Sequence, residues 1–367
     1  MKIAYTNCNI YTGKTIETGK AILTGNSIIS GLNDINDLPA GYTVKDLGGL
    51  NIAPAFIDLQ IYGGNGQLFS AELSIAAIEA TYQYCLAGGC SRFMLTMATN
   101  TIEKFLRGIE IVRQYWQQDG KGVLGLHMEG PYLNRVKRGA HLAACIKKPT
   151  VAEVAMLLDK GRGVLKMMTI APEVCDDEII RMLIDHDIIV SAGHSNATFQ
   201  EAARGFDLGI PTATHLFNAM SPFQSREPGL VGAIYHHQSV KSSVVADGVH
   251  VDFVSLEISK KIMGERLFFI TDAVAGTAEG EYRHVFKGDR FTLPDGTLSG
   301  SALTMMKSVQ NAIAHAGIPI EEALRMASAY PAQLLNNTVP LGKIEPGFAA
   351  EFVVFNDALE VIDVIIA

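Results

Sequence analysis

The chain has 367 residues, 48% of them hydrophobic, and its 30 basic and 38 acidic residues give a formal net charge of −8. A chain of this length and composition can bury a large core, which excludes an intrinsically disordered protein. No long run carries a single sign of charge, which argues against nucleic acid or an anionic membrane as the main partner, so we expect a small-molecule ligand.

The N-terminal segment MKIAYTNCNIYTGK lacks the long apolar stretch of a secretory signal, and no other segment is apolar enough for long enough to span a bilayer. The five cysteines are odd in number, and none forms a close pair of the kind that binds zinc. Such cysteines are typical of reduced thiols. We therefore expect a cytoplasmic protein without a membrane partner.

The first fifty residues and the last thirty share a high content of β-forming residues and turns, as in AILTGNSIISGL near the start and GKIEPGFAAEFVVFN near the end. The region between them has a different character. We therefore predict that residues 1–50 and 338–367 form one small β-sandwich domain built from both termini. Residues 51–337 would form the second domain.

The middle of the chain alternates short apolar runs with amphipathic helical segments, a pattern typical of repeated βα units. The predicted strands are 56–60, 92–96, 123–127, 165–170, 188–191, 212–215, 243–246 and 267–271, and the predicted helices are 76–88, 101–118, 150–161, 176–186, 197–205 and 302–317. Eight strands predict an α/β fold, a (β/α)8 TIM-type barrel. A doubly wound sheet is the alternative, but no glycine-rich phosphate loop follows the first run.

Polar residues follow several of these apolar runs, at the end of the barrel where functional groups gather. They are His127 and Glu129 (third run), His194 (fifth), His215 (sixth), Asp247 and His250 (seventh) and Asp272 (eighth). A single histidine after a strand more often makes a hydrogen bond than it binds metal. Two imidazoles and a carboxylate together, however, form a known ligand set for a catalytic divalent ion, so we predict that Glu129, His194 and His215 bind one metal ion.

The remaining polar groups receive other roles. Asp272, beside a metal-activated water, is the predicted general base. His127 is predicted to support the site or to pack. The other histidines are predicted to be surface or structural residues: His186, His236, His237, His284 and His315.

Nine segments in sequence order carry a resemblance to a known family: PAFIDLQIYGG, GLHMEGPYLN, RGAH, TIAPE, SAGHSNAT, THLFNAMSPFQSREPGLVG, VVADGVHVD, ITDAVAG and DGTLSGSALTM. Together they closely resemble the N-acetylglucosamine-6-phosphate deacetylase family of the amidohydrolase superfamily. The resemblance covers nearly the whole chain. It implies a metal-bearing (β/α)8 barrel that hydrolyses the acetamido group of N-acetylglucosamine 6-phosphate to glucosamine 6-phosphate and acetate, in amino-sugar catabolism.

The resemblance also implies roles for individual residues. His141 would polarise the substrate carbonyl, with Asp272 as the second catalytic residue, and Arg226 would contact the phosphate. The implied substrate-binding residues are Ala140, His141, Asn218, Ala219, Arg226, Asp247, His250, Leu298, Ser299 and Gly300. The implied cofactor is one divalent metal ion per subunit, zinc first, with iron, manganese or cobalt as alternatives. The implied assembly is a homodimer in which His250 reaches the site of the neighbouring subunit.

One departure from the wider superfamily concerns the first strand. Where most amidohydrolases have His-x-His, this chain has Gln60 and Tyr62. An amide and a phenol are poor replacements for two imidazoles, so we expect one tightly held metal ion, and a weak second site remains open. The preference between the glucosamine and galactosamine epimers also remains open.

Two other functions compete with deacetylation. Another amidohydrolase, such as a deaminase or a cyclic amidase, could use the same metal and aspartate, although Arg226 and the segment FNAM favour a phosphorylated sugar. The absence of His-x-His favours a catalytically inactive scaffold protein. The retained metal ligands and Asp272 argue against that function.

Overall fold

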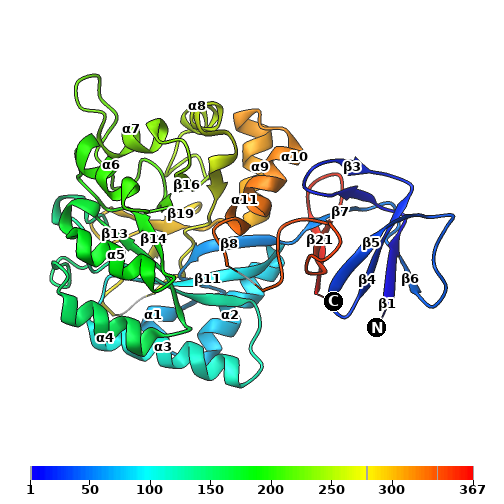
Figure 1. Ribbon diagram of the computed structural model, residues 1–367, viewed down its shortest axis with the longest axis horizontal. Helices are drawn as coiled ribbons and strands as arrows, with labels where there is room; N and C mark the ends of the chain where they lie inside the picture. The colour runs from blue at the N-terminus through cyan, green and yellow to red at the C-terminus, as the bar shows by residue number, and fades with distance from the viewer. Residues whose placement is uncertain (1, 278–279, 337, 367) are drawn as a thin grey trace. The chain divides into compact units, whose positions relative to one another are not determined.

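The computed structural model describes residues 2–277, 280–336 and 338–366. Eight parallel strands form one sheet in which each strand pairs with the next along the chain (Figure 1). These are β8 (Phe56–Ile61), β11 (Cys90–Ala98), β12 (Val123–Glu129), β13 (Leu165–Ile170), β14 (Ile189–Ala192), β15 (Thr212–Ala213), β16 (Lys241–Val244) and β17 (Leu267–Phe269). Each strand includes or overlaps one predicted strand.

The two outer strands of this sheet are joined by the residues that follow them, which closes the barrel. The Asp272 amide donates to the Gln60 carbonyl at 3.0 Å, and the Tyr62 amide donates to the Ala273 carbonyl at 2.9 Å. Parallel pairing of Ile61 with Ala273 continues this seam. The predicted (β/α)8 barrel is confirmed.

The helices of the described residues are α1 (Phe69–Glu72), α2 (Ile75–Ala87), α3 (Ile102–Gln117), α4 (Val151–Gly161), α5 (Asp177–Asp185), α6 (Phe199–Asp207), α7 (Gly229–His236), α8 (Phe253–Met263), α9 (Met305–Ala316), α10 (Ile320–Ala327) and α11 (Ala329–Ala332), with 3-10 turns at Arg135–Lys137, Pro172–Val174 and Gly264–Arg266. Helices α1 to α8 lie around the barrel strands (Figure 1). Several helices begin with the same cap. The hydroxyls of Thr101, Thr150, Thr198 and Thr304 each accept a backbone N–H three residues on, which satisfies a donor that the helix leaves free.

Helices α7, α8 and α10 were not among the predicted helices. Helix α7 is apolar on nearly all sides because most of it is buried, so it lacks a helical period. On α8, apolar side chains occupy an exposed face as well as the buried one, which hides the period in the same way.

The barrel strands also bury polar side chains that bond to one another. His127 Nδ1 lies 3.1 Å from the Leu59 carbonyl, and its Nε2 lies 2.8 Å from the Thr169 hydroxyl. Thr214 links Thr169 (2.8 Å) to Ser191 (2.5 Å). Burial lowers the pKa of His127 to about 4, so the ring is neutral and Nδ1–H donates to the carbonyl. His127 therefore supports the barrel interior.

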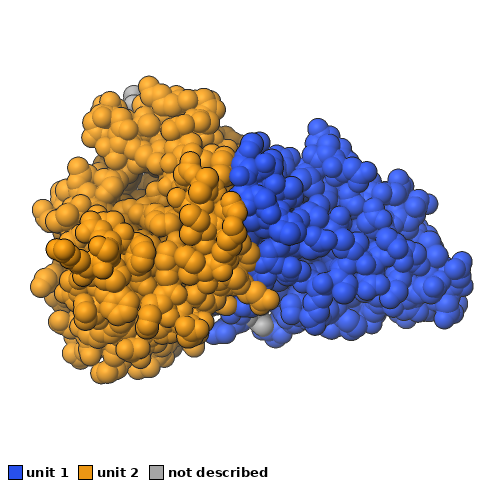
Figure 2. All heavy atoms as spheres, turned by 90° about the horizontal axis from the view of Figure 1, so that it is seen from above, with its two compact units in different colours: residues 1–58, 85–92, 304–367 blue, residues 59–84, 93–303 orange. Residues whose placement is uncertain are grey.

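The chain forms two compact units, residues 59–84 with 93–303 and residues 1–58 with 85–92 and 304–367 (Figure 2). The predicted division at residues 50 and 338 differs from these units and stays a prediction. In the described part of the chain, no helix combines the length and the apolar character needed to cross a membrane.

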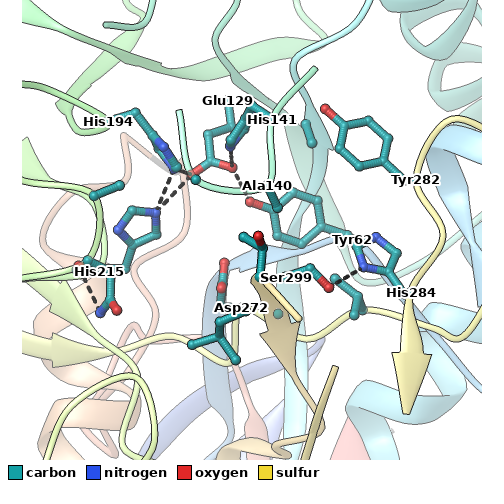
Figure 3. A pocket seen from close by; sticks show the side chains of 18 of the residues that line it. Tyr62, Glu129, Ala140, His141, His194, His215, Asp272, Tyr282, His284 and Ser299 are labelled. Atoms are coloured by element: carbon teal, nitrogen blue, oxygen red, sulfur yellow. Dashed lines mark hydrogen bonds and ion pairs between the residues drawn. The ribbon is translucent and has the colours of Figure 1, made fainter. Parts of the chain in front are cut away.

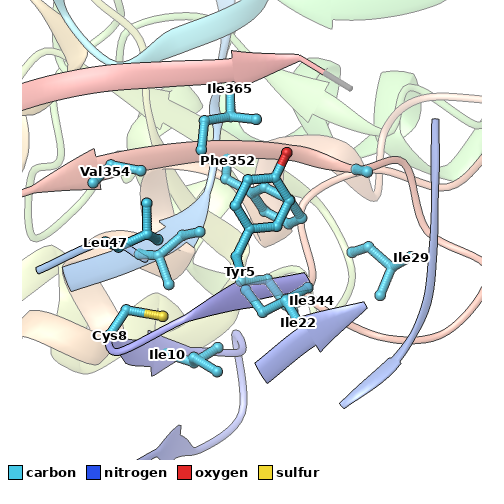
Figure 4. Close-up of a cluster of buried hydrophobic side chains, with 12 residues drawn as sticks. Tyr5, Cys8, Ile10, Ile22, Ile29, Leu47, Ile344, Phe352, Val354 and Ile365 are labelled. Atoms are coloured by element: carbon cyan, nitrogen blue, oxygen red, sulfur yellow. The ribbon is translucent and has the colours of Figure 1, made fainter. Parts of the chain in front are cut away.

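The second of these units contains strands from both ends of the chain. Their order is β5-β4-β1-β6 in one sheet and β22-β21-β7-β2-β3 in the other. Their bounds are β1 (Lys2–Thr6), β2 (Asn9–Tyr11), β3 (Ile16–Glu17), β4 (Lys20–Gly25), β5 (Ile28–Asp34), β6 (Thr43–Asp46), β7 (Asn51–Pro54), β21 (Glu351–Phe355) and β22 (Val361–Ile366). Side chains of both sheets, among them Tyr5, Ile22 and Phe352, share one buried apolar cluster (Figure 4), as the predicted β-sandwich requires.

Two small sheets complete the barrel unit. One pairs β9 (Gly63–Gly64) with β10 (Gln67–Leu68). The other, which we call the strand-8 hairpin sheet, follows the eighth barrel strand and contains β18 (Val285–Phe286), β19 (Arg290–Thr292) and β20 (Leu298–Ser301). The hairpin sheet and its preceding segment supply one wall of the cavity described next.

Candidate active site

A cavity of about 350 Å³ opens among the residues that follow the barrel strands (Figure 3). Its wall includes most of the predicted site residues: Glu129, Ala140, His141, His194, His215, Asn218, Ala219, His250, Asp272, Leu298, Ser299 and Gly300. The barrel brings these side chains together from segments far apart in sequence. This is the arrangement that the strand-end argument predicted.

Three of the side chains place one ligand atom each at a common point. Glu129 Oε1 lies 3.2 Å from His194 Nε2 and 3.1 Å from His215 Nε2. The two Nε2 atoms are 3.1 Å apart. Ligands held about 2.0 Å from a tetrahedral zinc ion are ~3.3 Å from one another, so these atoms fit a metal ion.

A second ligand set is possible within the same cluster, because single atoms of Glu129, His141 and His194 all lie within 4.8 Å of one another. His141, however, approaches the other carboxylate oxygen, with Nε2 3.0 Å from Glu129 Oε2. The tighter set of Glu129, His194 and His215 leaves His141 free to face a ligand. We therefore favour the predicted set.

The backbone at these positions is unusual. His194, His215 and Asp272 have φ angles of 47°, 38° and 53°, in the left-handed region that few non-glycine residues adopt. The left-handed turn ends the hydrogen-bonded pairing of the strands. Each of β15 and β17 therefore ends two residues earlier than the predicted strand does. Backbone strain of this kind gathers at functional sites.

The neighbour of one ligand has a steric requirement of its own. A Cβ on Gly193 would meet Thr169 Cγ2 at 2.8 Å and Thr214 Cβ at 2.9 Å, closer than side chains pack. Only glycine therefore fits between the adjoining strands at the point where His194 turns into the cavity.

Hydrogen bonds fix which nitrogen of His194 carries a proton. Nδ1 lies 2.9 Å from the Lys137 carbonyl, an acceptor, so Nδ1 is the donor and the Nε2 lone pair points into the cluster. Burial, and then the neighbouring His141, lower the pKa of His194. The ring is thus neutral, as a metal ligand must be.

His141 has the opposite tautomer. The Thr99 backbone N–H donates to His141 Nδ1 at 3.1 Å, so the proton lies on Nε2, which faces Glu129 Oε2 and the cavity. Tyr62 also donates to this oxygen. Burial alone would raise the pKa of Glu129, but the interaction with His141, whose Nε2–H faces Oε2, holds it well below its usual value. Glu129 is therefore an ionised carboxylate.

The Gln60 amide lies between the two carboxylates of the site. Its Nε2 is 3.0 Å from Glu129 Oε1 and 2.9 Å from Asp272 Oδ1. Gln60 and Tyr62 thus occupy the side of Glu129 where His-x-His would contribute ligands, which agrees with one tightly held ion.

Asp272 also faces the imidazole of the seventh strand end. His250 Nε2 lies 3.7 Å from Asp272 Oδ2, and His250 Nδ1 lies 2.6 Å from Asp247 Oδ2. Burial raises the pKa of Asp247, but its bonds to His250 and to two backbone N–H groups lower it overall. Asp247 does not line the cavity itself and acts on His250, which lines the cavity of its own chain.

Besides Asp247, two predicted assignments do not match the structure directly. Arg226 is exposed and is not among the residues that line the cavity. His284, expected to be surface or structural, is a buried residue of the cavity wall. Among the described residues that line the cavity, Lys137 is the one lysine or arginine. Sequence reasoning missed Lys137, although it stands three residues before Ala140, beside the segment RGAH.

Comparisons with known proteins agree with this geometry. The profile of the amidohydrolase family matches residues 51–367. A curated relative from Haemophilus influenzae, N-acetylglucosamine-6-phosphate deacetylase, is 35% identical over 100% of this chain and 98% of its own length. The crystal structure of N-acetylglucosamine-6-phosphate deacetylase from Pasteurella multocida is similar with a TM-score of 0.95 and 33% identity, covering 100% of this chain and 98% of that one. A mutant form of the Mycobacterium smegmatis enzyme, in complex with N-acetyl-D-glucosamine-6-phosphate, has a TM-score of 0.90 and 28% identity over 99% of this chain and 97% of that one.

Proposed function

The chain belongs to the amidohydrolase family, and we propose that it hydrolyses the acetamido group of N-acetylglucosamine 6-phosphate to glucosamine 6-phosphate and acetate, in amino-sugar catabolism. The observation that carries the proposal is the meeting of Glu129, His194 and His215 in one cavity with His141 and Asp272. The Haemophilus influenzae relative, named for this reaction, matches the chain over its whole length.

The proposed cofactor is one divalent metal ion held by Glu129, His194 and His215. Zinc suits these nitrogen and oxygen donors, and iron, manganese and cobalt can use them as well. When bound, such an ion lowers the pKa of a water molecule and polarises a carbonyl group.

The remaining steps are assigned to residues of the chain. Asp272 accepts a proton from the attacking water and delivers it to the departing amine. His141, with its proton on Nε2, donates a hydrogen bond to the substrate carbonyl oxygen as negative charge develops there. The Gln60 amide holds the Asp272 carboxylate in place.

The phosphate group requires positive charge and N–H donors. Lys137 lines the cavity, and within the described residues no carboxylate pairs with its ammonium group, so it is free to meet a phosphate. Arg226 stays a predicted phosphate contact. Asn218 and Ala219 stay predicted substrate-binding residues. Ala140, His250 and the segment 298–300 would contact the sugar.

The test is acetate release by the metal-loaded protein from N-acetylglucosamine 6-phosphate and from the unphosphorylated sugar. We expect a strong preference for the phosphorylated substrate. Equal rates would contradict the phosphate contacts. Ammonia release, or hydrolysis of cyclic amides in place of acetate release, would indicate a different amidohydrolase, and no turnover with metal bound would indicate a scaffold.

We also propose a cytoplasmic location and a homodimer. The five cysteines are unpaired in the structure, which supports a reducing compartment. The dimer is supported by an apolar stripe on one face of α8, formed by Val254, Ile258 and Ile262, which are 62%, 49% and 47% exposed. Apolar side chains in such a row are typical of surfaces that a partner covers.

A further inference from the structure

The imidazole of His284 is held firmly at the cavity wall. Its ring stacks on that of Tyr282, with 6.0 Å between ring centroids and 8° between planes. The Tyr282 hydroxyl donates to the Thr99 carbonyl at 2.6 Å, which anchors the pair. His284 Nδ1 lies 2.8 Å from the Ser299 hydroxyl. The ring is therefore fixed on both sides and cannot turn away from the cavity.

The other ring nitrogen of His284 has no hydrogen-bond partner among the residues that the structure describes. Within the described residues no group bonds to Nε2, although the residue is only 6% exposed. His284 is one of the residues that line the cavity. A fixed polar atom on a buried residue of a cavity wall is suited to a ligand.

The position of His284 excludes one part of the proposed substrate. Figure 3 shows His284 across the cavity from His194 and His215, beyond Ser299. The acetamido group must lie at those metal-binding imidazoles.

The chemistry of the ring points to one kind of group. The Ser299 hydroxyl can donate to Nδ1, which leaves Nε2–H as a donor, or accept from it, which leaves Nε2 as an acceptor. A sugar hydroxyl can use either state because it donates and accepts. Burial lowers the pKa of His284 to about 4, so the neutral ring offers no charge to a phosphate near pH 7.

Resting on the function proposed above, we propose that His284 Nε2, positioned by Ser299, binds a hydroxyl group of the sugar ring and helps to determine which sugar the enzyme accepts. His284 is thereby a specificity residue. It lies in the segment that precedes the strand-8 hairpin sheet, apart from the metal cluster.

The experiment compares metal-loaded wild type with His284→Phe, which keeps the ring stack on Tyr282 but has no ring nitrogen. Substrates are N-acetylglucosamine 6-phosphate, its C4 epimer, and analogues that lack the hydroxyl at C1, C3 or C4. For the full substrate we expect kcat/KM to fall roughly threefold to tenfold, through KM, as for the loss of one neutral hydrogen bond. For the deoxy analogue that lacks the bound hydroxyl, we expect wild type and variant to have equal kcat/KM.

His284→Gln retains a donor and an acceptor and should recover part of the loss. It also provides the same comparison should His284→Phe fail to fold. His186→Phe, at an exposed position, is the matched control and should have the same kcat/KM as wild type for every substrate and analogue. If kcat/KM of His284→Phe falls below that of wild type by the same factor for every analogue, or falls for none, the role of His284 is overturned. Deacetylation itself would still stand. An inactive wild type would instead overturn the proposed function and this inference together.

Discussion

The positions of protons on the imidazoles decide what the site can do. His194 and His141 both flank Glu129, yet one presents a lone pair from Nε2 and the other a proton. A backbone carbonyl of Lys137 sets the first state, and a backbone N–H of Thr99 sets the second. Two histidines of the same cluster are thus suited to metal binding and to carbonyl polarisation, respectively.

Asp272 provides the sharpest test of the mechanism. Asp272→Asn keeps the size of the side chain but cannot accept the proton of the attacking water, so we expect kcat to fall by about 10²- to 10⁴-fold. Metal content, measured by elemental analysis, should be unchanged because Asp272 is not among the ligands. Asp185→Asn, on the exposed surface of α5, should behave like wild type. A fully active Asp272→Asn variant would remove Asp272 as the base.

Lys137 and Arg226 can be separated as phosphate contacts. Lys137→Met should raise KM for the phosphorylated sugar by about tenfold or more and leave the unphosphorylated sugar unaffected, because a hydrogen bond to a charged group is lost. Lys137→Arg should keep most of the affinity. Arg226→Ala, measured in parallel, should raise KM as well if the exposed arginine contacts the phosphate, and an unchanged KM would refute that contact.

The meeting of the proposed metal ligands and base in one cavity could be predicted because each lies at the end of an apolar run, and a barrel brings such ends together. Glu129, His194, His215 and Asp272 all follow this rule. Lys137 and His284 do not, since they lie in connecting segments where no periodicity says which way a side chain points. The tautomers depend on backbone groups of distant segments, such as Thr99, and no local pattern records them.

The strands and most helices of the barrel were predictable for a similar reason. Buried parallel strands are short and continuously apolar, and helices such as α3 and α6 begin with capping threonines. The pattern failed for α7 and α8, whose apolar residues are not confined to one face. Strand ends were misplaced where the backbone turns left-handed, as at His215, because backbone conformation at a single residue is not encoded in its polarity.

The strand-8 hairpin sheet and its preceding segment couple the stability of the protein to pH through His284. Burial holds the folded-state pKa at about 4, below the unfolded value of 6.5, so the unfolded state binds more protons between these values. This stabilisation is complete above pH 6.5 and is lost as pH falls towards 4.

Urea unfolding measures this effect. Between pH 7.5 and 5.5, wild type should lose about 1.4 kcal/mol more unfolding free energy than His284→Phe, which cannot take up a proton at this position. The same loss in both proteins would show that the His284 ring is already accessible to protons in the folded state.

Assembly of the protein can be tested at the exposed stripe on α8. Ile258→Lys places a charge in the middle of the row of Val254, Ile258 and Ile262, so we expect it to convert the proposed dimer into monomers. Light scattering after size-exclusion chromatography should give twice the mass of one chain for wild type and the mass of one chain for the variant. Val151→Lys, at an exposed apolar position of α4, is the control and should not change the mass.

A dimeric Ile258→Lys variant would exclude this face as the interface, and a monomeric, active wild type would show that a partner is dispensable. The position of His250 indicates that catalysis does not need a partner subunit. Its imidazole already reaches Asp272 within its own chain.

The left-handed backbone at His194, His215 and Asp272 creates a trade-off between thermal stability and catalytic activity. Each of these residues costs about 1–2 kcal/mol relative to a right-handed conformation, a cost that glycine does not bear. A library of variants selected only for survival at high temperature should therefore accumulate glycine at these three positions, and the survivors should be inert. A library selected for growth on the amino sugar should keep all three side chains.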